Sequence, residues 1–153
     1  MEPTDSLSLA DFPETAEEPT TIEDVLTLSV AAVTLAGAGP DLAYAACAHM
    51  FRNRLRAVRR GLIGGSGQHR VGYGDGTWRG VSAAFQPGRL PAAREPLSRA
   101  QLRAMARVCR VAAGEEADIT RGATRCHRHD EAPRWARSAE ATALIGDLIF
   151  YRE

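Results

Sequence analysis

Lysine is absent from this sequence of 153 residues, and arginine supplies every one of its nineteen basic side chains. Arginine alone favours dense bidentate contacts to carboxylate or phosphate groups. The same bias is typical of proteins encoded by a GC-rich genome, and we favour that explanation. The missing lysine therefore indicates no particular ligand.

Long apolar runs and a basic leader are also missing. The longest apolar run, residues 25–38, has about fourteen residues, which is too short to cross a bilayer and predicts a core helix. The first residues are acidic, so the sequence predicts neither a secretory signal nor a membrane anchor. We therefore expect synthesis in the cytoplasm, with any action outside it requiring lysis, a pore or carriage on a particle.

Cysteine is scarce and odd in number, which does not suggest a disulfide framework. Cys47, Cys109 and Cys126 are widely spaced, and we expect reduced thiols. The run Cys126-His127-x-His129 contains residue types that bind zinc, but a structural site needs four ligands and no second pair is present. The sequence therefore predicts no metal, and it implies no other cofactor.

Charge divides the chain into two parts. Residues 1–24 hold eight acidic residues and no arginine, which leaves nineteen arginines against eleven acids in residues 25–153. We assign residues 1–22, rich in Pro, Thr, Ser and Glu, to a flexible acidic leader that serves as a linker or as a docking tail for a protein partner. Residues 23–153 are predicted to form one domain, because 44% hydrophobic content is enough for an ordinary core.

Three helices are predicted within that domain. The first begins at Ile22, is apolar on most sides and ends at Gly37. The second starts with Pro40 and Asp41 and runs to Arg60. In the third, Ser98 and Gln101 form a capping box, and the helix continues to Gly114.

The remaining segments predict loops and strands. Residues 62–96 are rich in glycine and lack a sustained period, which indicates loops with short strands. Pro133 opens a short helical turn, and residues 144–152 are typical of a single closing strand. The fold class is therefore α+β.

Three motifs near the C-terminus occur in a fixed order, and together they resemble the end of the SleB-type cell-wall hydrolases. They are Asp118-x-Thr120-x-Gly122-Ala123-Thr124-x-x-His127, Pro133-x-Trp135-Ala136 and Ile145-Gly146-Asp147-x-x-Phe150-Tyr151-Arg152. Upstream, the helix carrying Asn53 and Arg54 resembles an Asn-Arg helix of the family, Gly80-Val81 with Phe85-Gln86 its Gly-Val-x-x-x-Gln stretch, and residues 102–114 its Ala-rich helix.

The resemblance implies a compact lysozyme-like helical domain with a small antiparallel sheet. It also implies cleavage of peptidoglycan glycan strands, between N-acetylmuramic acid and N-acetylglucosamine, by a glycosidase or lytic transglycosylase. Thr124 and His127 are expected to line the cleft, Thr124 hydrogen-bonding a sugar and His127 orienting it. Asn53 is a third expected substrate-binding residue.

The general acid of the family is a glutamate at the end of the first core helix. Counted back from Asn53 without a gap, this position falls on Leu35, which cannot protonate a glycosidic oxygen. Four further positions or stretches depart from the family pattern: Arg125, Cys126, Asp147 and residues 89–92. The sequence therefore predicts a binding groove more firmly than it predicts catalysis.

Several other carboxylates are candidates for the missing acid: Asp41, Asp75, Glu115, Glu116 and Asp118. Asp41 is nearest in sequence, but a helix N-terminus lowers the pKa of a carboxyl group, so it is a weak substitute. Glu115 and Glu116 follow a helix end and are expected to be solvated.

Arginines cluster on the second helix, at Arg52, Arg54, Arg56, Arg59 and Arg60. Helical geometry spreads them around the helix and no aromatic ladder accompanies them, so we expect a solvated face and no nucleic-acid partner. Four aromatic residues could stack on sugars: Tyr73, Trp78, Trp135 and Tyr151. For Trp135 we favour burial beside the last strand. Three functions stay open: a cell-wall hydrolase, an inactive glycan-binding or structural component of a phage-like particle and, least favoured, a basic nucleic-acid-binding protein.

Overall fold

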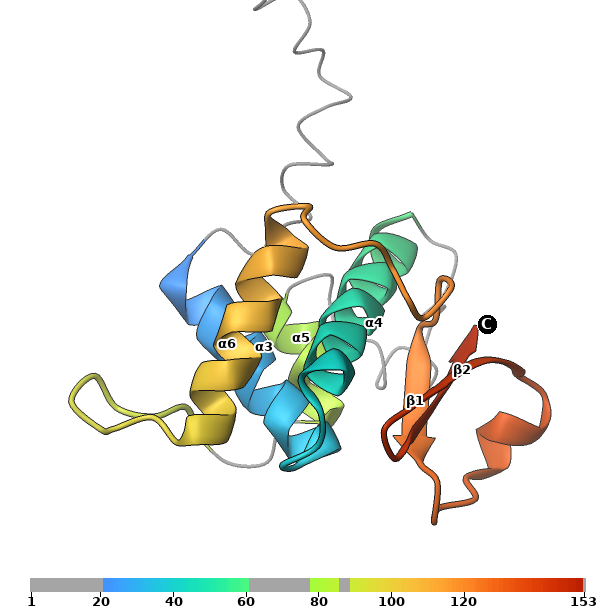
Figure 1. The fold of residues 1–153 in the computed structure, drawn as a ribbon. Helices are drawn as coiled ribbons and strands as arrows, with labels where there is room; N and C mark the ends of the chain where they lie inside the picture. Colours follow the sequence, from blue (N-terminus) through green and yellow to red (C-terminus); the bar gives the residue numbers. More distant parts are fainter. Residues whose placement is uncertain (1–20, 61–77, 86–88, 153) are drawn as a thin grey trace, which may run out of the picture.

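The computed structural model describes residues 21–60, 78–85 and 89–152. Within them the helices are α3 (Ile22–Ala36), α4 (Asp41–Arg59), α5 (Trp78–Ser82) and α6 (Arg99–Ala112), and the strands are β1 (Arg125–Arg128), β2 (Glu140–Ile145) and β3 (Leu148–Arg152). Two 3-10 helices, η2 (Ala83–Phe85) and η3 (Arg134–Arg137), complete them. The fold is α+β, as predicted, with the helices grouped beside a small sheet (Figure 1).

Helix α3 begins at the predicted point because Thr21 caps it. The Thr21 hydroxyl accepts a hydrogen bond from the Asp24 backbone N–H at 3.0 Å. The helix ends at Gly37, whose positive φ of 60° suits glycine. Thr21 and Ile22, which we had assigned to the acidic leader, therefore belong to this helix, and residues 1–20 lie outside the described residues.

Helix α4 is the centre of the core. It contacts α3, α5, α6 and the sheet, and four of its large apolar side chains are fully buried: Tyr44, Met50, Phe51 and Leu55. Pro40 is the N-cap of α4 and Asp41 its first residue, one position later than we predicted. The apolar area removed from water along α4 is a main source of the stability of the fold.

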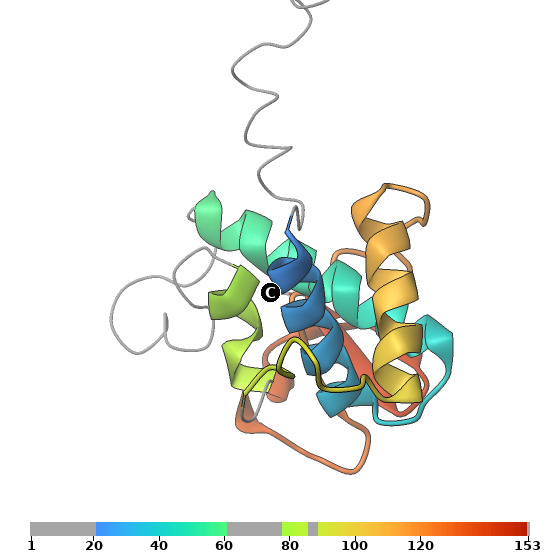
Figure 2. The ribbon, with the colours of Figure 1, turned by 90° about the vertical axis from the view of Figure 1, so that its left-hand side faces the viewer.

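Helix α6 starts with the predicted capping box. The Ser98 hydroxyl accepts from the Gln101 backbone N–H at 3.0 Å, and the Gln101 side chain accepts from the Ser98 N–H at 2.9 Å. Figure 2 shows α6 and α5 on opposite sides of α3. No helix within the described ranges has both the length and the apolar character needed to cross a membrane.

The sheet has three antiparallel strands in the order β1-β3-β2. The single closing strand that we predicted over residues 144–152 is wrong, because the chain turns at Gly146 and Asp147 and forms the β2–β3 hairpin. Gly146 has a positive φ of 59°, which a β-branched residue would not adopt without strain. Phe150 and Leu148 of β3 are buried in the core.

The prediction of loops with short strands over residues 62–96 also fails in part. Residues 78–85 form α5 and η2, and this described stretch contains no strand. Trp78 and Val81 are buried in the core, and α5 contacts both α3 and α4. Five residues are too few to show a helical period, so tertiary packing stabilises this helix and its sequence does not reveal it.

Candidate functional site

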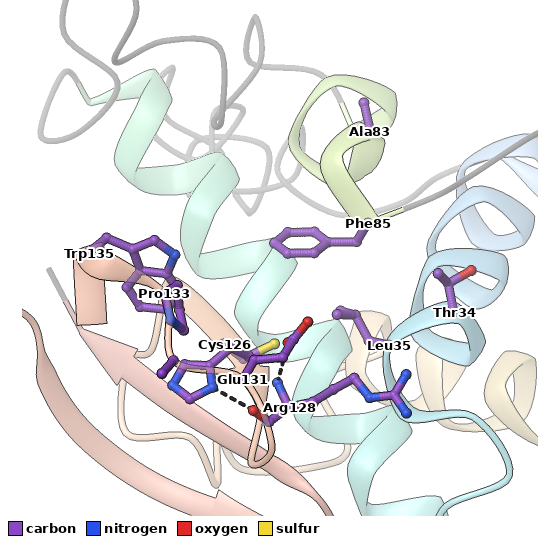
Figure 3. Close-up of a pocket in the computed structure, with 11 residues that line it drawn as sticks. Thr34, Leu35, Ala83, Phe85, Cys126, Arg128, Glu131, Pro133 and Trp135 are labelled. Carbon is purple, nitrogen blue, oxygen red and sulfur yellow. Dashed lines mark hydrogen bonds between the residues drawn. The ribbon is translucent and has the colours of Figure 1, made fainter. Parts of the chain in front are cut away.

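An open pocket of about 810 Å³ lies between the helices and the sheet, and we call it the groove. One wall, the helical wall, comes from the end of α3 and from η2: Thr34, Leu35, Ala83 and Phe85. The other, the polar wall, comes from β1, the following loop and η3: Cys126, His127, Arg128, Glu131, Ala132, Pro133 and Trp135. Figure 3 shows the two walls facing each other.

The helical wall has no ionisable side chain among the described residues. Leu35 is half-buried in the last turn of α3, and the exposed Thr34 gives its hydroxyl hydrogen to the Val30 carbonyl at 3.0 Å. Phe85 packs against Phe51, with 5.8 Å between the ring centroids. This wall therefore offers an apolar surface and no proton donor of suitable pKa.

The rings of His127, Trp135 and Tyr151 form an aromatic cluster at the polar wall. The ring of Trp135 meets Tyr151 edge-on at 5.1 Å and His127 at 5.7 Å between centroids, and His127 stacks on Tyr151 at 5.2 Å. The guanidinium carbon of Arg125 lies 4.8 Å from the Trp135 ring centroid. Trp135 is half-buried, not buried as we predicted, because its ring also lines the groove.

His127 is held by both of its ring nitrogens. Nδ1 lies 2.6 Å from the Arg128 carbonyl oxygen, and Nε2 lies 2.8 Å from the Tyr151 hydroxyl. A carbonyl only accepts, so Nδ1 carries the hydrogen and Nε2 accepts from Tyr151 in the neutral ring. His127 thus lines the groove in a fixed orientation, while the role that we predicted for it in orienting sugar stays a prediction.

Cys126 lies beside His127 and is buried. Burial raises the pKa of its thiol to about 12, because a thiolate would lose its solvation there. The thiol is therefore neutral at physiological pH and a poor nucleophile.

Thr124 and Asn53 both take part in the contact between α4 and the loop before β1, but they are not among the residues that line the groove. The Asn53 amide donates to Asp118 Oδ2 and to the Ala123 carbonyl, both at 2.9 Å. Thr124 is buried, and its carbonyl accepts from Arg54 at 2.7 Å. Their predicted roles in substrate binding stay predictions, whereas their contacts here anchor the polar wall to α4.

Asp118 is the centre of that anchor. Its Oδ1 accepts from the Thr120 backbone N–H at 2.8 Å and from the Thr120 hydroxyl at 2.6 Å, and its Oδ2 also accepts from the Gly122 N–H at 3.1 Å. Burial by itself would raise the pKa of Asp118, but the hydrogen bonds from Thr120 and Asn53 outweigh it and lower that pKa. Asp118 is thus ionised and structural in this position.

The other described carboxylates that we considered, Asp41, Glu115 and Glu116, are not among the residues that line the groove. Asp41 accepts from Arg103 Nε at 2.6 Å at the start of α4. Glu116, expected to be solvated, is instead mostly buried and accepts two hydrogen bonds from Arg107, at 2.8 and 2.9 Å, which lower its pKa. Glu115 is exposed, as expected, and Asp75 lies outside the described residues.

Glu131 is the carboxylate that sequence reasoning missed. Figure 3 shows it in the groove, where its Oε1 accepts from the Arg128 backbone N–H at 2.9 Å. It is exposed to solvent. Its place between His127 and Trp135 in the C-terminal motifs was the one available signal.

We predicted that the arginine cluster on α4 is a solvated face, and this prediction is wrong for Arg54. Arg54 is 1% exposed, and besides its bond to Thr124 it lies over the Phe85 ring at 5.2 Å. It therefore ties α4 to the segments that form both walls. Across the ranges that the structure describes, no group of three or more His, Cys, Asp or Glu residues is arranged to hold a metal ion.

Fold and groove together define an α+β domain with an open groove between its helices and its sheet. Among solved structures, the chain is similar to the crystal structure of the catalytic domain of the Bacillus cereus SleB protein, with a TM-score of 0.61 and 20% sequence identity over 89% of this chain and 96% of that one. No family model matches the chain, and no curated protein matches its sequence. The likeness confirms the SleB-like resemblance at the level of the fold.

Proposed function

We propose that the groove binds the glycan strands of peptidoglycan. The observation that carries the proposal is the half-buried Trp135 ring in the wall of an open groove on a SleB-like fold. An aromatic face packs well against the apolar face of a sugar ring, and the nearby polar groups can take its hydroxyl and acetamido hydrogen bonds. Peptidoglycan is the substrate class that the resemblance implies.

We further propose that the groove binds strands without cleaving them. Cleavage requires a carboxyl group of raised pKa beside the glycosidic oxygen. Leu35 occupies the helical wall at the position where the resemblance places that acid, and Glu131 on the opposite wall is exposed and accepts a backbone hydrogen bond.

Cleavage through Glu131 is the second candidate function, because this carboxylate does line the groove. In that case the chain would be a glycosidase or lytic transglycosylase whose acid has moved to the polar wall. Binding and cleavage differ in what they leave in solution.

Sedimentation with insoluble peptidoglycan tests both candidates in one tube. The full chain is mixed with purified peptidoglycan and, separately, with microcrystalline cellulose, which has no acetamido groups. We expect the protein in the peptidoglycan pellet, little in the cellulose pellet, and no sugar released into the supernatant. Released muropeptides would favour cleavage through Glu131, and folded protein that stays in both supernatants would contradict binding.

A further inference from the structure

The groove has a charged end at the corner where β1 runs into the following loop. Arg128 and Glu131 both line the groove there, and both are exposed. Figure 3 shows the Arg128 side chain extending from β1 toward the segment that carries Thr34 and Leu35. The positive charge of Arg128 therefore extends from the polar wall toward the helical wall.

The backbone of Arg128 is fixed, whereas its guanidinium is not engaged. Its N–H bonds to Glu131 Oε1 at 2.9 Å, and its carbonyl accepts from His127 Nδ1 at 2.6 Å. Within the described residues, no hydrogen bond or ion pair holds the guanidinium of Arg128. Other arginines are held by carboxylates, as Arg103 is by Asp41, Arg107 by Glu116 and Arg152 by Glu140.

The surroundings of Arg128 are cationic. In residues 121–137 five arginines stand against two acidic residues. Two of these arginines, Arg134 and Arg137, are exposed on η3 on either side of Trp135. An anion that approaches the polar wall therefore meets a favourable field, despite the opposing charges of Asp130 and Glu131.

We propose that Arg128 makes the groove selective for N-acetyl-sugar polymers that carry carboxylates. This inference rests on the proposed glycan-binding function and names the part of the ligand that is read. Every second sugar of a peptidoglycan strand bears a lactyl group that ends in a carboxylate or in an acidic peptide. A guanidinium pairs with a carboxylate through two parallel hydrogen bonds. Chitin has the same N-acetylglucosamine backbone and no such group.

Calorimetric titration of the full chain with three soluble ligands tests the proposal: peptide-free glycan strands, strands with their peptides, and chitin oligosaccharides of equal length. We expect peptide-free strands to bind about ten-fold more tightly than chitin at low salt, with the preference shrinking as salt is added. A preference that appears only for peptide-bearing strands assigns the recognised carboxylate to the peptide.

Three variants separate Arg128 from general charge. Arg128→Gln should reduce the preference to within about two-fold, because the affinity for charged strands falls toward the affinity for chitin. Arg94→Gln removes an exposed arginine that does not line the groove, and it should behave like the wild type. Glu131→Gln removes the opposing charge and should tighten binding to charged strands by about two-fold.

The outcomes distinguish this inference from the proposed function. Equal affinity of the wild type for strands and chitin, or an unchanged preference in Arg128→Gln, overturns carboxylate selectivity while glycan binding stands. Absence of binding to all three ligands by the folded wild type overturns the proposed function itself.

Discussion

The two walls of the groove differ in kind. The helical wall is apolar and belongs to the continuous core, with Leu35 at the end of α3 and Phe85 packed on Phe51. The polar wall holds the charges of Arg128 and Glu131 and the half-buried ring of Trp135, on β1, the following loop and η3. Glycosidic cleavage needs a desolvated acid, and the wall with desolvating surroundings has none.

The residues that hold the loop before β1 against α4 are different from the residues that line the groove. Three residues match the family motifs: Asn53, Asp118 and Thr124. Their hydrogen bonds hold the loop before β1 against α4. Two of the positions that depart from the family pattern, Leu35 and Cys126, line the groove.

Loss of the anchor should have the largest effect. Asp118→Ala leaves the Thr120, Gly122 and Asn53 donors without their acceptor, so we expect the free energy of unfolding to fall by about 3 kcal/mol. Urea unfolding measures this. Asp130→Ala, at an exposed position after β1, should change it by less than about 0.5 kcal/mol. Equal effects of the two variants would mean that the polar wall does not depend on Asp118.

Removal of the half-buried Trp135 ring should have the second-largest effect, which is on glycan binding. Trp135→Ala removes the aromatic surface of the polar wall, and we expect about ten-fold weaker sedimentation with peptidoglycan. Trp78→Phe is the matched control, because Trp78 is 5% exposed in the core and does not line the groove. A loss of binding in the control alone would place the ligand elsewhere.

A carboxylate on the helical wall should make the two walls chemically alike. The half-buried position of Leu35 would raise the pKa of a glutamate there, so Leu35→Glu should release reducing sugar or anhydro-sugar ends from peptidoglycan. The cost in stability should be about 1 to 2 kcal/mol. Leu35→Gln keeps the shape without the acid and should release nothing. Release by the wild type at the rate of Leu35→Glu would contradict our assignment of the wall.

Loss of the ion pair between Arg107 and Glu116 should have the smallest effect. Hydrogen bonds from Arg107 lower the pKa of Glu116, so the folded state keeps this group ionised at a pH where the unfolded state protonates it. The resulting stability is present above the unfolded pKa and is lost as the pH falls through the folded value. Unfolding at about pH 6 and about pH 3 should show an acid loss that Arg107→Gln reduces by on the order of 1 kcal/mol. Glycan binding at neutral pH should not change, since neither residue lines the groove. Weaker binding in Arg107→Gln would contradict our view that this ion pair has no part in ligand binding.

The helices were predictable because their signals are local. The capping box at Ser98 and the glycine at position 37 lie within a few residues of the helix ends that they define. The hairpin turn at Gly146 was missed because the apolar residues on both sides continue a strand pattern through it. Helix α5 was missed because its stability comes from packing on α3 and α4.

The groove was predictable only in part. The motif residue His127 and the register that leads to Leu35 both fall on its lining. Apart from the place of Glu131 among the C-terminal motifs, no pattern marked Arg128 or Glu131, since a side chain at a strand end or in a loop enters a site through the path of the chain and not through any periodic pattern. The partial burial of Trp135 likewise depends on what the sheet leaves uncovered.

The two tryptophans of the chain allow the most direct test of the account. Each indole N–H gives one signal in a proton–nitrogen NMR spectrum, Trp135 from the groove and Trp78 from the core. On titration with soluble peptidoglycan strands, we predict that the Trp135 signal moves to saturation while the Trp78 signal stays in place. A stationary Trp135 signal at a strand concentration that saturates binding would contradict the account.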